Sequence, residues 1–137
     1  MTEPTTHTSI GSLNILVVDD EPMIREFLSD LLTLRGHRPR TADSSASALI
    51  DLQRQPCDLV ITDVFMPSTN GLDMAACIRQ TYPDVRIVVM SGHSQGPIAD
   101  DSRWSAVDAF LSKPFSNQEL TETINYATGA SRAGAAS

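Results

Sequence analysis

Polar side chains suited to phosphate chemistry follow four separate apolar runs in the sequence. They are two adjacent carboxylates, a third carboxylate, a hydroxyl and an amine: Asp19, Asp20, Asp63, Ser91 and Lys113. Short runs of β-branched and apolar residues, such as residues 15–18, are typical of strands buried on both faces of a parallel sheet. Because the carboxyl ends of parallel strands lie on one side, where ligands bind, we expect these groups to meet at one site.

Three carboxylates at one edge of a sheet would repel one another unless a cation compensates them. Two carboxylates about 4 Å apart repel by about 1 kcal/mol in water, and by several times more at an effective dielectric constant of about 20. Mg²⁺ is the expected cofactor, since it takes oxygen ligands and is often held by carboxylates together with phosphate oxygens. The Lys113 ammonium and the Ser91 hydroxyl suit phosphate oxygens. A carboxylate beside both the metal and the amine could serve as a nucleophile.

Each of these residues alone also has an ordinary structural explanation. Acids such as Asp19 and Asp20 stabilise the N-terminus of a helix, Asp63 could begin a turn, and Ser91 precedes a glycine in a typical turn sequence. Their joint occurrence favours a functional site, because each group follows a different predicted strand.

Helical patterns separate the predicted strands. Apolar residues recur at helical spacing in four segments: residues 22–36, 44–53, 72–82 and 116–129. A further short helix could begin at Pro97 and end near Ser105. A weak strand at residues 38–42 contains Pro39, which cannot donate to a ladder and so predicts an edge position. Right-handed crossovers then favour an α/β fold, a (βα)5 doubly wound five-stranded parallel sheet of order 2-1-3-4-5.

Composition and charge narrow the class of protein. The 137 residues fit one domain, and the formal net charge of −7 argues against a nucleic-acid-binding surface, which needs a basic stripe. No stretch approaches the roughly 18 apolar residues of a membrane helix, and the first residues lack the pattern of a secretory signal. We therefore expect a cytoplasmic protein that contacts neither nucleic acid nor membrane.

The sequence also predicts the state of the two cysteines and the extent of the domain. Cys57 and Cys77 have no metal-ligand spacing, so we expect reduced and largely buried thiols. We expect the domain at residues 13–128, a disordered N-terminal segment at 1–12 and a disordered tail at 129–137.

Four stretches together form a specific pattern. They are ILVVDDEP at residues 15–22, DLVITDVFMP at 58–67, Ser91-Gly92, and DAFLSKPF at 108–115. In combination they resemble the receiver domain of response regulators in two-component signalling, of the chemotaxis-type single-domain kind. The resemblance implies a flavodoxin-like fold and a phosphoprotein that is not an enzyme in the usual sense, since it catalyses only phosphorylation and dephosphorylation of its own aspartate.

The resemblance also implies a role for each site residue. Asp63 is the phosphoacceptor. Mg²⁺ is held by four groups, the carboxylates of Asp19, Asp20 and Asp63 and the backbone carbonyl of Phe65. Ser91 and Lys113 contact the phosphoryl group, and the Lys113–Pro114 peptide bond is expected to be cis.

Partners and a switch follow from the same resemblance. The phosphoryl donor is a phosphohistidine on a sensor histidine kinase or a histidine phosphotransfer protein, which docks at the helix of residues 22–36 and the loop after the last strand. On phosphorylation Ser91 moves toward the phosphoryl oxygens, and Phe110 turns inward to fill the space. An unknown downstream protein is expected to bind at the short helix that begins at Pro97, the last strand and the last helix. The protein is expected to be a monomer or a weak dimer.

Phe110 could instead serve only to fill the core. Physically, phosphorylation raises the charge on Asp63 from −1 to nearly −2, which draws hydroxyl and ammonium groups together. Because phenylalanine has no hydroxyl, any output contact of Phe110 must be apolar.

Three positions depart from the family pattern. Phe65 is large and apolar where an amide or acid could orient water, so we hypothesise that hydrolysis of the Asp63 acyl phosphate depends little on water activation within the site. A Phe65→Asn substitution that leaves the phosphoryl half-life unchanged would contradict this. His93 is not a carboxylate, and could be a metal ligand or a solvated loop residue. Ala106-Val107 replaces a turn that commonly carries glycine.

Two other functions are compatible with parts of the pattern. A phosphatase of the haloacid-dehalogenase type also uses an aspartyl nucleophile, Mg²⁺, a hydroxyl and a lysine, but places its nucleophile in a DxD motif after the first strand. Here the first predicted strand ends in adjacent aspartates, and Asp63 follows the third. The chain could also be a pseudo-receiver scaffold that is never phosphorylated, although every expected site residue is present.

Overall fold

The chain folds around a five-stranded parallel sheet flanked by helices. The structure is a computed structural model, and it describes residues 11–66, 69–92 and 102–129. The elements, in chain order, are β1 Asn14–Val18, α1 Pro22–Leu34, β2 Arg38–Ala42, α2 Ser45–Arg54, β3 Leu59–Asp63, β4 Phe65–Met66, β5 Thr69–Asn70, α3 Gly71–Thr81, β6 Arg86–Ser91, the 3₁₀ helix η2 Ser102–Ala106, β7 Ala109–Ser112 and α4 Asn117–Thr128. The large sheet has the order β2-β1-β3-β6-β7, and all its neighbours are parallel. This confirms the predicted fold and strand order.

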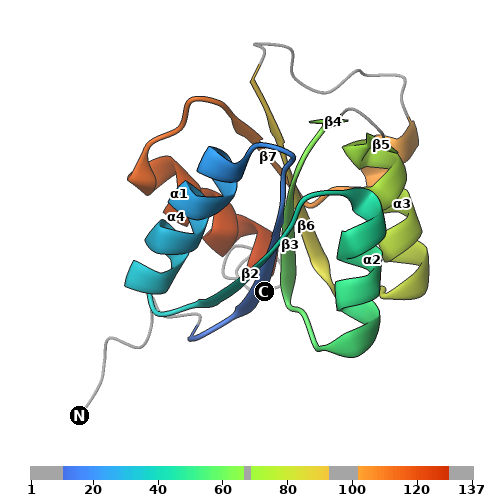
Figure 1. Cartoon of the computed structure of the whole chain (residues 1–137), viewed down its shortest axis with the longest axis horizontal. Helices are drawn as coiled ribbons and strands as arrows, with labels where there is room; N and C mark the ends of the chain where they lie inside the picture. Colours follow the sequence, from blue (N-terminus) through green and yellow to red (C-terminus); the bar gives the residue numbers. More distant parts are fainter. Residues whose placement is uncertain (1–10, 67–68, 93–101, 130–137) are drawn as a thin grey trace.

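Helices cover both faces of the sheet, so the core forms two layers. Figure 1 shows α1 and α4 on one face and α2 and α3 on the other. Side chains alternate between the faces along each strand. In β1, Ile15 and Val17 pack in the layer under α1 and α4, whereas Leu16 and Val18 pack in the layer under α2 and α3. Because both faces are covered, the strands read as continuous apolar runs rather than as alternating ones.

The ends of the elements follow local sequence signals. Ser116 and Glu119 form a capping box at the start of α4, and Gly129 ends that helix in the left-handed conformation, with φ of 113°. Ser44 caps α2 in the same way, with Ser47 as its partner. Pro39 lies in β2, which pairs with β1 alone and therefore is an edge strand, as predicted.

The structure corrects the expectation for the cysteines, adds two elements that were not predicted in this form, and leaves other expectations untested. Cys77 is exposed, because the outer side of α3 carries it; Cys57 is only half-buried, and burial raises the pKa of its thiol to about 11. The antiparallel pair β4–β5 was not predicted. In the predicted short helix that begins at Pro97 and ends near Ser105, the described residues belong to the 3₁₀ helix η2. His93, Pro97, residues 1–10 and residues 130–137 lie outside the described residues, so the domain boundaries remain predictions.

An arginine clamp accounts for the unusual Ala106-Val107 turn. Arg79 of α3 donates to the backbone carbonyl of Ala106 at 3.2 Å and forms an ion pair with Asp108 at 2.5 Å. Asp108 also accepts a hydrogen bond from the backbone N–H of Ile87 at 2.8 Å. The Ala106 side chain is buried in the core, so the turn is held by packing and by the guanidinium, without glycine.

Candidate functional site

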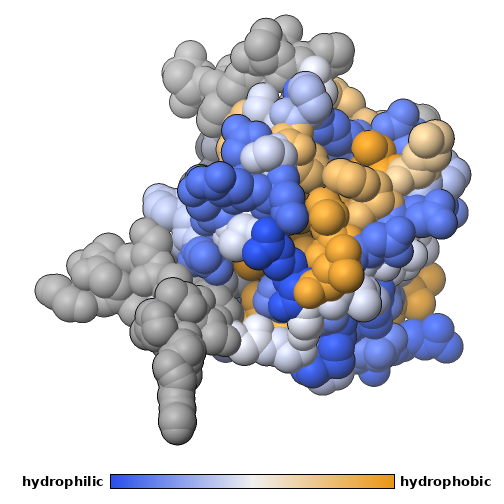
Figure 2. Space-filling view, turned by 90° about the vertical axis from the view of Figure 1, so that its left-hand side faces the viewer, coloured by the Kyte–Doolittle hydropathy of each residue, from blue (hydrophilic) through white to orange (hydrophobic). Residues whose placement is uncertain are grey.

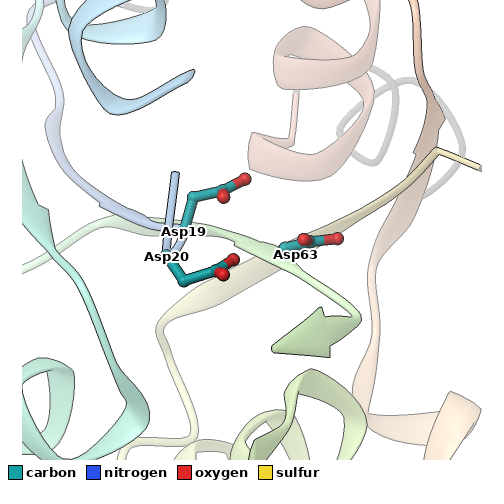
Figure 3. A group of neighbouring side chains, drawn as sticks. All are labelled: Asp19, Asp20 and Asp63. Carbon is teal, nitrogen blue, oxygen red and sulfur yellow. The ribbon is translucent and has the colours of Figure 1, made fainter. Parts of the chain in front are cut away.

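Three carboxylates meet at the carboxyl edge of the sheet, as the strand-end pattern predicts. Asp19 and Asp20 follow β1, and Asp63 ends β3 beside it. Each offers one carboxylate oxygen within 4.8 Å of the others. Figure 3 shows the three side chains pointing to the same side of the edge. Such a group is stable in its charged form only with a cation among the oxygens.

Asp19 is the most constrained of the three acids. Its side chain is fully buried, and its two oxygens have separate partners. Oδ1 accepts a hydrogen bond from the backbone N–H of Glu21 at 2.9 Å, and Oδ2 accepts one from Lys113 Nζ at 3.2 Å. Since a buried charge must be paired, these contacts explain how an acid is tolerated there. Asp20, by contrast, is exposed.

Asp63 combines partial access with an unfavourable electrostatic environment. Its side chain is 11% exposed, and its Oδ2 lies 3.6 Å from Lys113 Nζ. Burial raises the pKa of the Asp63 carboxyl, and the neighbouring Asp19 adds to this, while Lys113 acts in the opposite direction. The Asp63 carboxylate therefore keeps a small solvent-accessible surface, unlike that of Asp19, and burial is the main reason why its charged form is disfavoured.

Ser91 and Lys113, the predicted hydroxyl and amine, lie at the carboxyl ends of the next two strands of the sheet. Ser91 ends β6 next to β3, is 2% exposed, and its carbonyl accepts from the backbone N–H of Lys113 at 2.7 Å. Lys113, the only lysine of the sequence, follows β7. The Lys113–Pro114 peptide bond is cis, as the resemblance implied. Phe65 is 54% exposed, two residues after Asp63.

Gly71 lies so close to the site that no side chain fits. A Cβ atom at this position would lie 2.1 Å from the Asp63 carbonyl oxygen, and the Gly71 N–H donates to the Val64 carbonyl at 2.7 Å. The start of α3 therefore packs directly on the backbone of the aspartate loop. Nothing in the local sequence around Gly71 indicates this close approach.

Gly71→Ala is therefore expected to lower the free energy of unfolding by about 1–3 kcal/mol, because backbone must shift to admit the methyl group. Urea unfolding followed by circular dichroism measures the change. Gly92→Ala is the matched control, since its Cβ would lie 3.9 Å from the Lys113 side chain and its backbone needs no positive φ. Equal stability of the two variants would show that the close approach is unimportant.

One contact at the site was not predicted from the sequence. Arg25, in the first turn of α1, donates from Nη1 to the backbone carbonyl of Asp19 at 2.7 Å. It holds the loop that carries Asp19 and Asp20, and adds positive charge near the acids. Its six-residue separation from Asp19 spans a strand end and a helix start, so no local periodicity reveals the contact.

The family of the chain follows from comparison with known proteins. The model of the response regulator receiver domain matches residues 15–125. DNA-binding transcriptional regulator NtrC of Azospirillum brasilense is 35% identical over 118 residues, which cover 86% of this chain and 24% of NtrC. The chain thus spans about a quarter of the length of this longer relative. The chain belongs to the response regulator receiver domain family.

Solved structures of response regulators have the same fold as this chain. Response regulator TrrA of Thermotoga maritima, in complex with Mg²⁺–BeF, has a TM-score of 0.76 at 36% identity, and the match covers 82% of this chain and 96% of TrrA. TrrA has also been crystallised with the histidine kinase ThkA. Chemotaxis protein CheY4 of Vibrio cholerae has a TM-score of 0.78 at 26% identity, and the match covers 85% of this chain and 99% of CheY4. Among the described residues, no helix is long and apolar enough to cross a membrane.

The residues present fit Mg²⁺. All three acids supply hard oxygen donors, and the group contains no thiolate or imidazole that would favour a softer metal. Asp20 is exposed and Asp63 partly so, which leaves room for the water ligands that Mg²⁺ retains.

Proposed function

We propose that the chain is a phosphorylation-activated switch of a two-component phosphorelay, with Asp63 as the phosphoacceptor. The observation that carries this proposal is the three-acid pocket with a single lysine bridging Asp19 and Asp63, at 3.2 and 3.6 Å. It supports a covalent chemistry in which one carboxylate reacts while the others hold a metal ion.

Geometry favours Asp63 over Asp19 as the nucleophile. Both oxygens of Asp19 are already engaged, and its side chain has no exposed surface. Asp63 is partly exposed and lies on the central strand, between β1 and β6. One of its oxygens attacks the phosphorus of a phosphohistidine and forms an acyl phosphate, while the P–N bond breaks and the histidine nitrogen leaves with the electron pair.

The other residues serve this transfer. Asp19, Asp20, Asp63 and the carbonyl of Phe65 would hold Mg²⁺, which supplies positive charge beside the phosphoryl oxygens when bound. Lys113 binds a phosphoryl oxygen, and the Ser91 hydroxyl binds another. The Lys113 side chain is only 16% exposed, so solvent screens its charge less than that of a fully exposed lysine.

Acetyl phosphate and Mg²⁺ provide the direct test. We expect intact-protein mass spectrometry to show a gain of about 80 Da, the mass of one phosphoryl group, which chelation of Mg²⁺ by EDTA prevents. No adduct at saturating acetyl phosphate would refute the proposal and favour a pseudo-receiver scaffold. Repeated turnover of a small phosphoester would favour the haloacid-dehalogenase alternative.

A partner surface for the phosphoryl donor lies beside the site. Met23 and Phe27 of α1 are 80% and 48% exposed, and the Phe27 ring lies 6.4 Å from that of Phe115, which follows β7. Figure 2, which views the side of α1 and α4, shows apolar residues gathered in a band among hydrophilic ones. We name Met23, Phe27 and Phe115 the α1 patch and propose that a histidine kinase or phosphotransfer protein docks there.

Phe27→Asp is expected to slow phosphorylation by a histidine kinase that recognises the wild-type chain, by about 10-fold or more in kcat/KM, because a central apolar contact is lost. Acetyl phosphate does not dock on this patch, so its reaction should be unchanged. Ile50→Asp is the matched control, since Ile50 is 53% exposed on α2, on the opposite face of the sheet. Equal slowing by both variants would contradict docking at the α1 patch.

We propose that a downstream protein binds at η2, β7 and α4, where Phe110 is half-buried. We propose a chemotaxis-type single-domain regulator on the likeness to chemotaxis protein CheY4, which has 26% identity and a TM-score of 0.78. NtrC, in which the matched region is a quarter of the protein, supports a receiver attached to other domains. A monomer or weak dimer in the cytoplasm, without nucleic-acid contact, remains our prediction.

A further inference from the structure

Trp104 has an unusual environment. It is the only tryptophan of the sequence and lies in η2, half-buried against the core layer under α2 and α3. Its ring packs edge-on against Phe110, with centroids 5.8 Å apart and planes at 65°. Its indole Nε1 is buried and has no hydrogen-bond partner. In the part of the chain that the structure describes, no other buried side-chain nitrogen or oxygen lacks one.

A buried donor without an acceptor is unfavourable, because the N–H has lost its hydrogen bond to water and gained none in return. Few such groups occur in native proteins, and each calls for an explanation. A rearrangement that lets this N–H reach an acceptor would recover the missing hydrogen bond, which offsets part of the packing that is lost. The unpartnered indole therefore lowers the cost of a second arrangement of this region.

Phe110 connects Trp104 with the phosphorylation site. In the pairing of β6 with β7, Val89 lies opposite Phe110, and Ser91 lies opposite Ser112. Because side chains alternate along a strand, Val89, Ser91 and Phe110 are on the same face of the sheet, the one that Trp104 covers. Movement of Ser91 toward Asp63 would open space on this face, in line with the Phe110 ring.

Phe110 also borders an open groove. The groove has a volume of about 400 Å³ and is lined by Ala109 and Phe110 of β7 and by Glu122, Thr123 and Tyr126 of α4. Phe110 is thus the residue shared by the groove and the Trp104 contact. When its ring turns inward, it leaves both.

We propose that Trp104 is a second switch residue, coupled to the site through Phe110. In the unphosphorylated protein its N–H is buried and unpaired against the Phe110 ring. When Phe110 turns inward, the indole loses its edge-on neighbour and its N–H becomes accessible from the groove, where solvent binds it. The gain of this hydrogen bond favours the activated arrangement. This inference rests on the proposed phosphorylation of Asp63.

The single tryptophan makes the test direct. Beryllofluoride with Mg²⁺ serves as the phosphoryl mimic, and its binding is followed separately by ¹⁹F NMR. On saturation we expect the emission of Trp104 to shift to the red and its acrylamide quenching constant to rise at least about two-fold, as expected when a population moves to an exposed state. The one indole N–H signal in a ¹H–¹⁵N spectrum should exchange faster with solvent.

The outcomes separate this inference from the proposed function. If ¹⁹F NMR shows no bound beryllofluoride, both fail. If beryllofluoride binds while the indole signal, emission and quenching stay unchanged, only the role of Trp104 is refuted.

Two variants test the route. Phe110→Leu should bind beryllofluoride yet lose the change at Trp104, because the ring that covers the indole is absent. Tyr82→Leu, the matched control, removes an aromatic ring packed against the same core layer and should retain the change. Full retention in Phe110→Leu would overturn the inference.

Discussion

Asp63→Asn is expected to abolish the phosphoryl adduct formed with acetyl phosphate and Mg²⁺ while raising the stability of the metal-free protein. The amide cannot act as the attacking oxygen, and no other acid of the pocket can replace it. Asp19 is buried with both oxygens engaged, and Asp20 lies in the loop after β1 rather than at the end of the central strand. Mass spectrometry before and after reaction measures the loss.

The gain in stability follows from the raised pKa of the Asp63 carboxyl. A carboxyl whose pKa is higher in the folded state than in the unfolded state makes the fold less stable once it ionises. The wild-type protein without Mg²⁺ should therefore lose stability as the pH rises through the folded-state pKa of Asp63, and Asp63→Asn should lose less. Thermal unfolding across this range measures the difference.

Asp84→Asn provides the control, since it removes an exposed acid in the turn before β6, away from the carboxyl edge. It should retain the adduct of about 80 Da and the pH dependence of the wild type. An adduct that persists in Asp63→Asn would show that another group is the phosphoacceptor.

Lys113→Met is expected to separate metal binding from phosphoryl transfer. Phosphorylation by acetyl phosphate should slow by about 100-fold or more, the usual cost of removing one charged contact to the reacting group. Mg²⁺ should bind about 10-fold more tightly, because a single positive charge about 5 Å from a divalent ion repels it by 1–2 kcal/mol in water. Lys113 Nζ lies 3.2 Å from Asp19 and 3.6 Å from Asp63, two of the expected ligands.

Isothermal titration with Mg²⁺ and the initial rate of adduct formation measure the two effects. Removal of Lys113 leaves the buried Asp19 carboxylate without its cation, so folding is checked in the presence of Mg²⁺, which can replace that charge. Arg54→Met is the control, because Arg54 is an exposed cation in the last turn of α2. Weaker Mg²⁺ binding in Lys113→Met would show that the lysine organises the ligands instead of competing with the metal.

The strand-end groups could be predicted because the apolar runs before them are local features, and the sheet order because crossover handedness and an edge position for the Pro39 strand favour it. Buried parallel strands require short continuous apolar runs, and those runs locate β1, β3, β6 and β7 without any knowledge of their contacts. Pro39 indicated the edge strand because it lacks an N–H. The helix starts at Ser44 and Ser116 were likewise visible, since capping acts within a single turn.

The side of each helix that faces the sheet could not be predicted in the same way. The apolar stripe of α1 includes Met23 and Phe27 as well as Leu28 and Leu32, and periodicity makes all four available for burial. The structure buries Leu28 and Leu32 and leaves Met23 and Phe27 exposed. Which part of a wide stripe faces the core depends on packing against the sheet, and that choice created the α1 patch.

The sequence by itself determined which chemical groups this protein brings to the edge of its sheet, because each group directly follows a short apolar run that is typical of a buried parallel strand. Only the tertiary structure decided what each group can do there. It engaged both oxygens of Asp19, left Asp63 reachable, placed Arg25 on the loop carbonyl and buried the Trp104 N–H against Phe110. These outcomes depend on contacts between residues on different elements, at distances that no local pattern specifies.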